Sequence, residues 1–244
     1  LLALVSWLDA PPNAPWRGIV VGNEIVDALP TQRFEITTEG TRELYVCTRG
    51  ASFDYTLGPP MPSVLERIGP DLLAQLPLGY RSEIQPQLGA WLSGLTSTMQ
   101  QGLVLLFDYG YPRPEFYLPE RSAGTLVCHY QQRMFDAPFW YPGLVDLSSS
   151  VEFTALAEAG IRSGLELAAY LSQAEFLMAG ALAPVLGNLE MLSERARMAL
   201  SLEVRTLTLP SEMGERIKLM AFARGLPESA RAPVLHRFGL RGSL

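Results

Sequence analysis

The stretch Gly18-Ile-Val-Val-Gly-Asn-Glu-Ile-Val-Asp-Ala-Leu-Pro30 decides the fold of this 244-residue chain. Residues 19–21 are too few for a helix and are rich in β-branched side chains, which predicts a fully buried strand. The chain turns polar immediately afterwards, at Asn23. We therefore expect polar side chains at the carboxyl end of a buried strand, where open α/β sheets bind their ligands.

A short helical turn is predicted for residues 24–29. The side-chain oxygen of Asn23 can cap its start, and Pro30 stops it because the residue before a proline is driven out of the helical region. In such a turn Glu24 and Asp27 stand three positions apart, so both carboxylates project from one face. Spacing alone leaves two interpretations at equal weight, a pair of acids that binds a ligand and a capped turn that faces water.

Composition and charge narrow the classes of function. A hydrophobic content of 48% is enough to bury a core as one large domain or one domain with an insertion. The net charge of -6 argues against a nucleic-acid partner, which requires a basic surface. Cys47 and Cys128 lie far apart, which indicates a reducing compartment, by default the cytoplasm, with no disulfide framework and no metal site. No apolar run reaches the length of a membrane span.

The remaining pattern predicts alternating strands and helices. Alternating residues at 32–38 and 43–48 predict a β-hairpin, and an apolar helical period predicts a helix at 84–101. Residues 103–107 are a second continuous apolar run, which predicts a strand buried on both faces that forms a β-α-β unit with the first. The other predicted elements are strands at 5–7, 125–130, 165–171 and 217–223, a helix at 64–68 in an irregular excursion over 51–77, a helix at 151–159, and a helix or helix pair at 186–206.

Residues 23–30, followed by Gln32 and Phe34, resemble the signature of the MidA-type methyltransferases. These class I S-adenosylmethionine enzymes occur in bacteria and mitochondria and include protein arginine methyltransferases linked to respiratory complex I assembly. Further blocks follow in the order of the family and extend the resemblance over nearly the whole chain. They are Asp108-Tyr-Gly-Tyr111, Arg121 with Gly124-Thr-Leu126, Tyr141-Pro-Gly143 with Asp146, Val151-Glu-Phe-Thr-Ala-Leu156, and Leu209-Pro-Ser-Glu-Met-Gly-Glu215.

The resemblance implies an α/β fold with the Rossmann-like, mostly parallel sheet of class I methyltransferases, ending in an antiparallel pair of strands. The predicted strands 5–7, 19–21 and 103–107 would be the third, fourth and fifth of that sheet, and 165–171 and 217–223 the last two. The first two strands and the glycine-rich cofactor loop have no counterpart in the sequence. We therefore expect residues 1–244 to be the C-terminal part of one methyltransferase domain, with β-hairpin and helical insertions at about 31–80 and 111–145.

The resemblance also implies S-adenosylmethionine as the cofactor and a protein arginine as the acceptor, on a partner such as a respiratory-complex subunit. A guanidinium group stays protonated near neutral pH, so carboxylates must localise its charge. Glu24 and Asp27 are assigned this catalytic role. Asn23 is expected to contact the cofactor or the substrate, or alternatively to cap the turn, and Glu24 is expected to lie beside the cofactor as well.

Three residues of the later blocks complete the expected substrate site. Asp108 is either a second acid for the substrate or the residue that fixes the turn at Gly110, and Tyr109 stands next to it. Arg121 either pairs with one of the acids or is simply solvated.

Departures from the family pattern keep a second function open. Gln131 and Gln132 stand where the histidine of the family is expected, and Glu152 stands where a shorter acid is usual, so no role is assigned to His129. Together with the absent glycine-rich loop, these changes favour a binding or assembly protein that keeps the fold without catalysis. The intact acids favour a methyltransferase, which is the preferred hypothesis.

Overall fold

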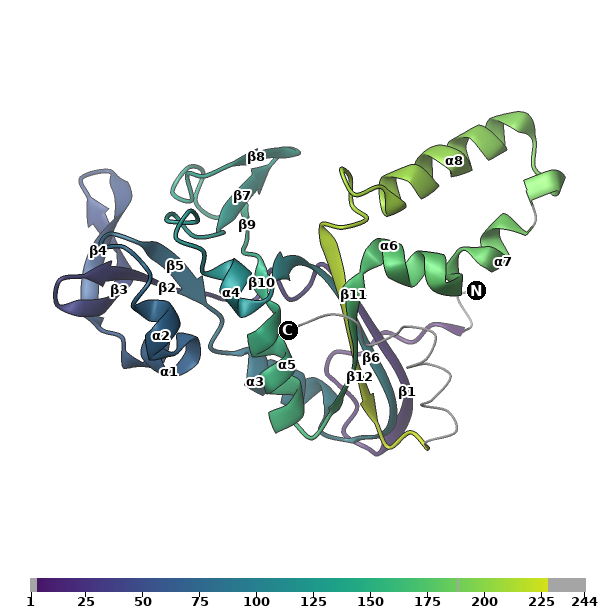
Figure 1. Ribbon diagram of the computed structural model, residues 1–244, viewed down its shortest axis with the longest axis horizontal. Coiled ribbons are helices and arrows are strands. Elements are labelled where there is room, and N and C mark those ends of the chain that lie inside the picture. Colours follow the sequence, from purple (N-terminus) through teal and green to yellow (C-terminus); the bar gives the residue numbers. More distant parts are fainter. Residues whose placement is uncertain (1–3, 188, 228–244) are drawn as a thin grey trace. The chain divides into compact units, whose positions relative to one another are not determined.

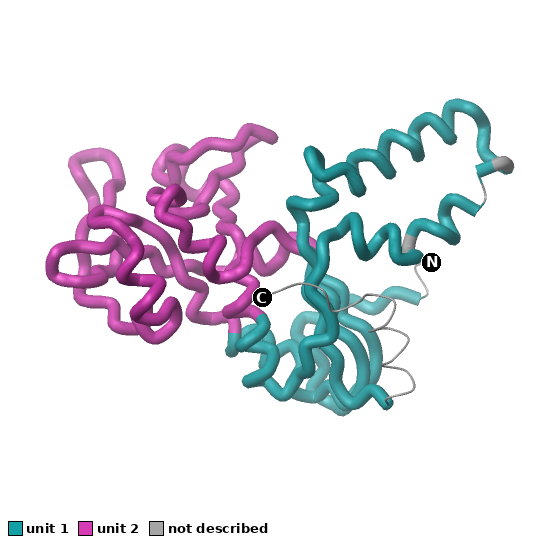
Figure 2. Tube along the Cα trace, viewed as in Figure 1, with its two compact units in different colours: residues 1–22, 89–107, 157–243 teal, residues 23–88, 108–156, 244 magenta. Residues whose placement is uncertain are grey.

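The structure is a computed structural model that describes residues 4–187 and 189–227 (Figure 1). The chain divides into two compact units, shown in different colours in Figure 2. The first unit takes its described residues from 1–22, 89–107 and 157–243, and the second takes them from 23–88 and 108–156. Among the described residues, no helix combines the length and the apolar character needed to cross a bilayer.

A sheet with the strand order β1-β6-β12-β11 is the framework of the first unit (Figure 1). β1 and β6 run in the same direction, because Trp16 donates to the Thr98 carbonyl at their starts and Gly18 lies against Gly102 further along. β11 and β12 pair antiparallel, which confirms the antiparallel pair expected at one end of a mixed sheet. The four strands are β1 (Trp16–Asn23), β6 (Met99–Tyr111), β11 (Glu166–Ser172) and β12 (Ile217–Arg224).

In chain order, α3 precedes β6, α5 precedes β11, and three further helices follow β11. A side-chain carbon at Gly160 would collide with the Phe222 ring, so the helix that carries Gly160 packs directly on β12. On the sheet, buried alanines and leucines of β11 and β12 meet Leu103, Leu105 and Phe107 of β6. The helices are α3 (Leu88–Thr96), α5 (Phe153–Arg162), α6 (Gln173–Phe176), α7 (Ala183–Leu186) and α8 (Glu194–Thr208), with a π-helical turn at Leu177–Ala181 and a 3-10 turn at Leu189–Met191.

The second unit is built on an antiparallel sheet with the order β4-β3-β2-β5. β2 and β3 form the predicted hairpin, with Thr37 opposite Gly40 at its turn. The irregular excursion predicted for 51–77 is wrong in its first part, because Phe53, Tyr55 and Leu57 alternate along a third strand that pairs with β3. The strands are β2 (Gln32–Thr37), β3 (Gly40–Arg49), β4 (Ser52–Pro60) and β5 (Arg81–Ile84).

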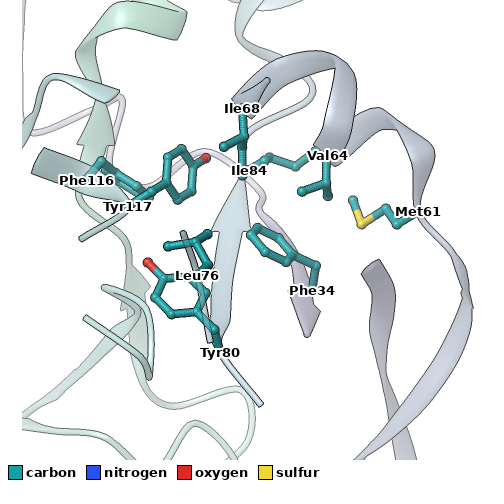
Figure 3. Close-up of a cluster of buried hydrophobic side chains, with 9 residues drawn as sticks. All are labelled: Phe34, Met61, Val64, Ile68, Leu76, Tyr80, Ile84, Phe116 and Tyr117. Atoms are coloured by element: carbon teal, nitrogen blue, oxygen red, sulfur yellow. The ribbon is translucent and has the colours of Figure 1, made fainter. Parts of the chain in front are cut away.

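Helices and aromatic side chains close the core of this unit over β2 and β5 (Figure 3). The predicted helix at 64–68 is present as α1 (Pro62–Ile68), and α2 (Pro70–Leu73) and α4 (Arg113–Phe116) complete the helices. The rings of Phe34 and Tyr117 lie 6.4 Å apart. Nine buried side chains form the cluster: Phe34, Met61, Val64, Ile68, Leu76, Tyr80, Ile84, Phe116 and Tyr117.

A small antiparallel sheet with the order β8-β7-β9 and a short parallel pair complete the second unit. Val151 of β10 lies opposite Gly110 at the end of β6, so the helix predicted at 151–159 starts two residues later, as α5. A side-chain carbon at Gly110 would collide with the Val151 carbonyl, which explains the glycine at this position. The four strands are β7 (Val127–Tyr130), β8 (Arg133–Phe135), β9 (Asp146–Ser148) and β10 (Val151–Glu152).

Full burial of the strand at residues 19–21 is a wrong prediction. Ile19 and Val21 are 62% and 65% exposed. Their strand, β1, ends the sheet order and pairs only with β6 within the described part of the chain. By contrast, Val104 and Leu106 of β6 are fully buried, because β6 has a neighbour on each side.

Three other elements differ from their predicted bounds. Residues 5–7 form no strand, and Val5 and Trp7 are exposed, because no strand of the described chain lies beside them. The helix predicted at 84–101 is only α3, since Pro86 disfavours helix before it and β6 begins at Met99. In place of the helix or helix pair predicted at 186–206, α7 ends at Leu186 and α8 begins at Glu194, where the Ser193 hydroxyl accepts a hydrogen bond from the Ala196 N–H. The missing first strands and the single domain with two insertions stay predictions.

Candidate functional site

The acidic loop, residues 23–29, connects the end of β1 to β2. The helical turn predicted here is wrong: Glu24 has a φ of 50°, in the left-handed region, and the loop closes with a single tight turn from the Val26 carbonyl to the Leu29 N–H. Asn23 is the last residue of β1 rather than a cap. The physical reason is that a left-handed residue at position 24 cannot belong to a right-handed helix, and distant groups, described next, hold the backbone of this segment in its observed conformation.

That side chain is Asp108, which is fully buried. Its Oδ2 accepts hydrogen bonds from the backbone N–H of Val26, at 2.9 Å, and of Asp27, at 3.2 Å. Its Oδ1 accepts from the N–H of Tyr109 at 2.9 Å. Of the two roles left open for Asp108, the geometry corresponds to fixing backbone, although the backbone it holds is the acidic loop and not the turn at Gly110.

Burial and mutual repulsion set the electrostatics of this loop. Burial, followed by the nearby charge of Asp27, raises the pKa of Asp108 to about 7. Burial, followed by the charge of Glu24, also raises the pKa of Asp27, against the opposing effects of the Ala28 N–H and of His129. Asp27 therefore lies within electrostatic range of two other carboxyl groups, the exposed Glu24 and the buried Asp108. A cation placed among them would relieve the repulsion that raises these pKa values.

The carbonyl groups of the acidic loop are held as well as its N–H groups. The side-chain Nε2 of Gln85 donates to the Val26 carbonyl at 2.8 Å, in a buried hydrogen bond. The N–H of Ser149 donates to the Asp27 carbonyl at 3.0 Å. An irregular loop is thereby fixed in one conformation by groups from three separate segments of the chain.

Glu83, a buried glutamate that was not among the predicted site residues, is linked to this loop through hydrogen bonds of Thr125 and residues 149–150. Glu83 of β5 is 1% exposed, and its Oε1 accepts from both the N–H and the hydroxyl of Thr125, at 2.6 and 2.7 Å. The Nε of Arg33 lies 3.7 Å from Glu83 Oε2. Burial raises the pKa of Glu83, while Thr125 and Arg33 lower it. The sequence feature that could have indicated a buried carboxylate here is the position of charged Glu83 next to apolar Ile84 in a short strand.

Asn23 and Glu24 are both exposed, next to each other at the end of β1. Tyr109 follows the buried Asp108 and is half-buried. The structure thus brings the two catalytic candidates together with Asn23 and Asp108.

Arg121 lies apart from this group. Its guanidinium stacks 3.8 Å above the centre of the Tyr111 ring, and its Nε donates to the Glu115 carbonyl at 3.0 Å. Pairing of Arg121 with one of the acids, one of the two roles considered, is therefore not what the structure shows. The Tyr111 ring and the Glu115 carbonyl satisfy the guanidinium locally.

The glutamines that replace the expected histidine form a tight turn. Gln131 and Gln132 both have left-handed φ angles, 49° and 63°, and connect β7 to β8. Two such residues are typical of a hairpin whose twist matches its strands. His129, to which the sequence analysis gave no role, lies on β7 close enough to Asp27 to lower the pKa of that acid. Its closeness to Asp27 is set by the tertiary fold.

Both the sequence and the fold of the chain match known proteins. Residues 1–171 match the family described as "Putative S-adenosyl-L-methionine-dependent methyltransferase". A crystal structure of a COG1565 superfamily member from Burkholderia thailandensis bound to S-adenosyl-homocysteine is 34% identical, with a TM-score of 0.83, over 93% of this chain. A native crystal structure of a COG1565 superfamily protein from the same organism is also 34% identical, with a TM-score of 0.83, over 92% of this chain.

The chain spans 58% and 60% of the length of these two related chains. No curated protein matched it. The family match covers more than half of the chain, and the methyltransferase-like mixed sheet agrees with it. The chain therefore belongs to this family of S-adenosyl-L-methionine-dependent methyltransferases, as its resemblance to the MidA type predicted.

Proposed function

We propose that the protein to which this chain belongs is an S-adenosylmethionine-dependent methyltransferase that acts on an arginine of a protein partner. The observation that carries the proposal is the acidic loop, where Glu24 and Asp27 lie beside the buried Asp108 and the pKa values of both aspartates are raised. A guanidinium group has the charge and the forked donors that such a group of carboxylates binds. The resemblance to the MidA type supports a respiratory-complex subunit as the partner.

The residues present fit one side of the cofactor. S-adenosylmethionine, when bound, supplies an electrophilic methyl group. Asn23 and Glu24 are exposed at the end of β1, where an open α/β sheet binds its ligand. The side chain of Asn23 is assigned to the cofactor, and Glu24 is placed beside it with its carboxylate directed to the acceptor. The described residues contain no glycine-rich turn after a strand, so we assign that loop to the part of the related chains that this chain does not cover.

The chemistry required of the acidic loop is orientation and proton removal. Glu24 and Asp27 would hold the guanidinium so that one nitrogen points its lone pair at the methyl carbon, and positioning of this kind accounts for much of the rate. The cofactor would supply the methyl group together with its leaving group, and the nitrogen that accepts the methyl group would have to lose a proton. Asp27 is assigned as the acceptor of that proton, because its raised pKa suits a general base better than an ordinary carboxylate.

The test is Glu24→Gln in the complete protein, with Glu66→Gln as the matched control. Glu66 is an exposed glutamate of α1, so the control removes the same charge from another surface. Transfer of a labelled methyl group to extract from cells that lack the gene is measured, and the labelled protein is hydrolysed to identify the modified amino acid. Binding of S-adenosylhomocysteine is measured by calorimetry.

We expect labelled methylarginine with the unsubstituted protein and with Glu66→Gln, and transfer reduced at least about a hundredfold by Glu24→Gln, with S-adenosylhomocysteine still bound. Label on another amino acid would exclude the arginine acceptor. The second candidate, a non-catalytic assembly protein, is favoured by Gln131 and Gln132, which form only a hairpin turn where a histidine was expected. Binding of S-adenosylhomocysteine without transfer to any protein of the extract would support that candidate.

A further inference from the structure

We propose that Glu83 and Gln85, at the end of β5, are positioning residues that hold the acidic loop in its reactive conformation. This inference rests on the proposed function, because it gives Asp27 a reacting partner. Both side chains lie outside the loop. Gln85 contacts the loop backbone directly, and Glu83 reaches it through Thr125 and residues 149–150.

Gln85 makes the direct contact. Its Nε2 donates to the Val26 carbonyl at 2.8 Å, across 59 positions of sequence, and the side chain is 6% exposed. A buried amide that donates to a loop carbonyl fixes the orientation of that peptide group, since an unpaired carbonyl in the same place would be costly.

Glu83 acts through a chain of hydrogen bonds. Its Oε1 accepts from the N–H and the hydroxyl of Thr125, and the Thr125 hydroxyl oxygen accepts from the N–H of Ser150 at 2.9 Å. The preceding residue, Ser149, donates its own N–H to the Asp27 carbonyl at 3.0 Å. Glu83 therefore locates the segment that binds the peptide group of Asp27.

The close approach of this segment to Glu83 depends on a glycine. Gly124 has a φ of 81°, and a side-chain carbon there would collide with the Glu83 carboxylate. Only a glycine adopts this backbone without strain and leaves the space that the carboxylate fills. The left-handed backbone of Gly124 thus allows the next residue, Thr125, to contact Glu83.

Together, these contacts give a hydrogen-bond partner to each of the four backbone polar groups of Val26 and Asp27. Asp108 accepts from their two N–H groups, and Gln85 and Ser149 donate to their two carbonyls. The loop has no helix or strand of its own to fix it. These contacts therefore determine where the Asp27 carboxylate lies, and a displacement of about 1 Å can slow an enzyme by on the order of a hundredfold.

The test compares Thr125→Val with Thr125→Ser in the complete protein. Valine has the shape of threonine but lacks the hydroxyl that links Glu83 to Ser150, whereas serine keeps it. The control is Thr41→Val, which removes a hydroxyl of the same unit that donates to the Met61 carbonyl at 3.1 Å and has no bond to the acidic loop. Methyl transfer, S-adenosylhomocysteine binding and hydrogen exchange of the peptide containing residues 23–29 are measured for each.

For Thr125→Val we expect kcat to fall about tenfold or more, with unchanged S-adenosylhomocysteine affinity and faster exchange in the acidic loop. Thr125→Ser should keep kcat and the exchange rate of the acidic loop close to those of the unsubstituted protein, and Thr41→Val should alter neither quantity. Equal turnover and equal exchange in all variants, with an active unsubstituted protein, would overturn the positioning role alone. No methyl transfer by the unsubstituted protein would overturn the proposed function and the positioning role with it.

Discussion

The carboxylate of Asp108 accepts a hydrogen bond from the backbone N–H of Val26 at 2.9 Å, although 82 positions separate the two residues in the sequence. The bond joins the buried end of β6 to the loop that follows β1. Asp108 also binds the Asp27 N–H, so one carboxylate holds two successive peptide groups of the loop. One buried carboxylate thus decides the conformation of the loop that carries the candidate catalytic acids.

Removal of this carboxylate should destabilise the protein. Asp108→Ala leaves the N–H groups of Val26, Asp27 and Tyr109 without their shared acceptor, and we expect the free energy of unfolding to fall by at least about 2 kcal/mol. Urea denaturation measures the loss. The control Asp54→Ala removes an aspartate whose ion pair with Arg49 is largely exposed, and should cost less than about 1 kcal/mol. Equal losses in the two variants would contradict the assigned role of Asp108.

Stability should also depend on pH through Asp108. Burial raises its pKa to about 7 in the folded protein, from 3.8 for an ordinary aspartate. Between about pH 4 and pH 7 the folded state keeps a proton that the unfolded state has lost, so the free energy of unfolding should fall as the pH rises through this window. The slope is at most about 1.4 kcal/mol per pH unit. In urea denaturation from pH 4 to pH 8, the free energy of unfolding should fall less steeply with pH for Asp108→Asn than for the unsubstituted protein. Parallel pH dependences for the two proteins would refute the raised pKa.

The pairing of β6 with β10 should not tolerate a side chain at Gly110. Gly110→Ala places a carbon on the Val151 carbonyl, and we expect a loss of more than about 1 kcal/mol in the free energy of unfolding. Gly89→Ala is the matched control, because a side-chain carbon there meets no atom within 4 Å and the residue lies in α3. It should stabilise the protein by about 0.5–1 kcal/mol. Thermal or urea denaturation compares the two, and a neutral Gly110→Ala would contradict the packing described here.

The two thiols should differ in reactivity. Cys128 is fully buried, and burial raises the pKa of its thiol, so little reactive thiolate is accessible. Cys47 is half-buried. We expect iodoacetamide to modify Cys47 well before Cys128 in the folded protein, and both in 6 M guanidinium chloride, as a peptide mass map would record. Equal modification of both thiols in the folded protein would show that β7 opens readily.

Local patterns in the sequence located several elements but did not determine their burial. Apolar runs and alternation are local properties, so they located β6, β11, β12 and the β2–β3 hairpin without any knowledge of the fold. The same local pattern at residues 19–21 overestimated burial, because burial of Ile19 and Val21 depends on a neighbouring strand. The alternating residues of β4 were passed over because glycines and prolines surround them.

The sequence alone determined the four strands of the first unit, the β2–β3 hairpin, the order of the family motifs and the presence of two acids beyond the end of β1. Only the tertiary structure decided the conformation of those acids, because the groups that hold the acidic loop, Asp108, Gln85 and Ser149, come from distant segments. It also placed Arg121 over Tyr111 and buried Glu83 against Thr125. Secondary structure follows from neighbours along the chain, whereas the partner of a buried polar group is chosen by the packing that removes it from water.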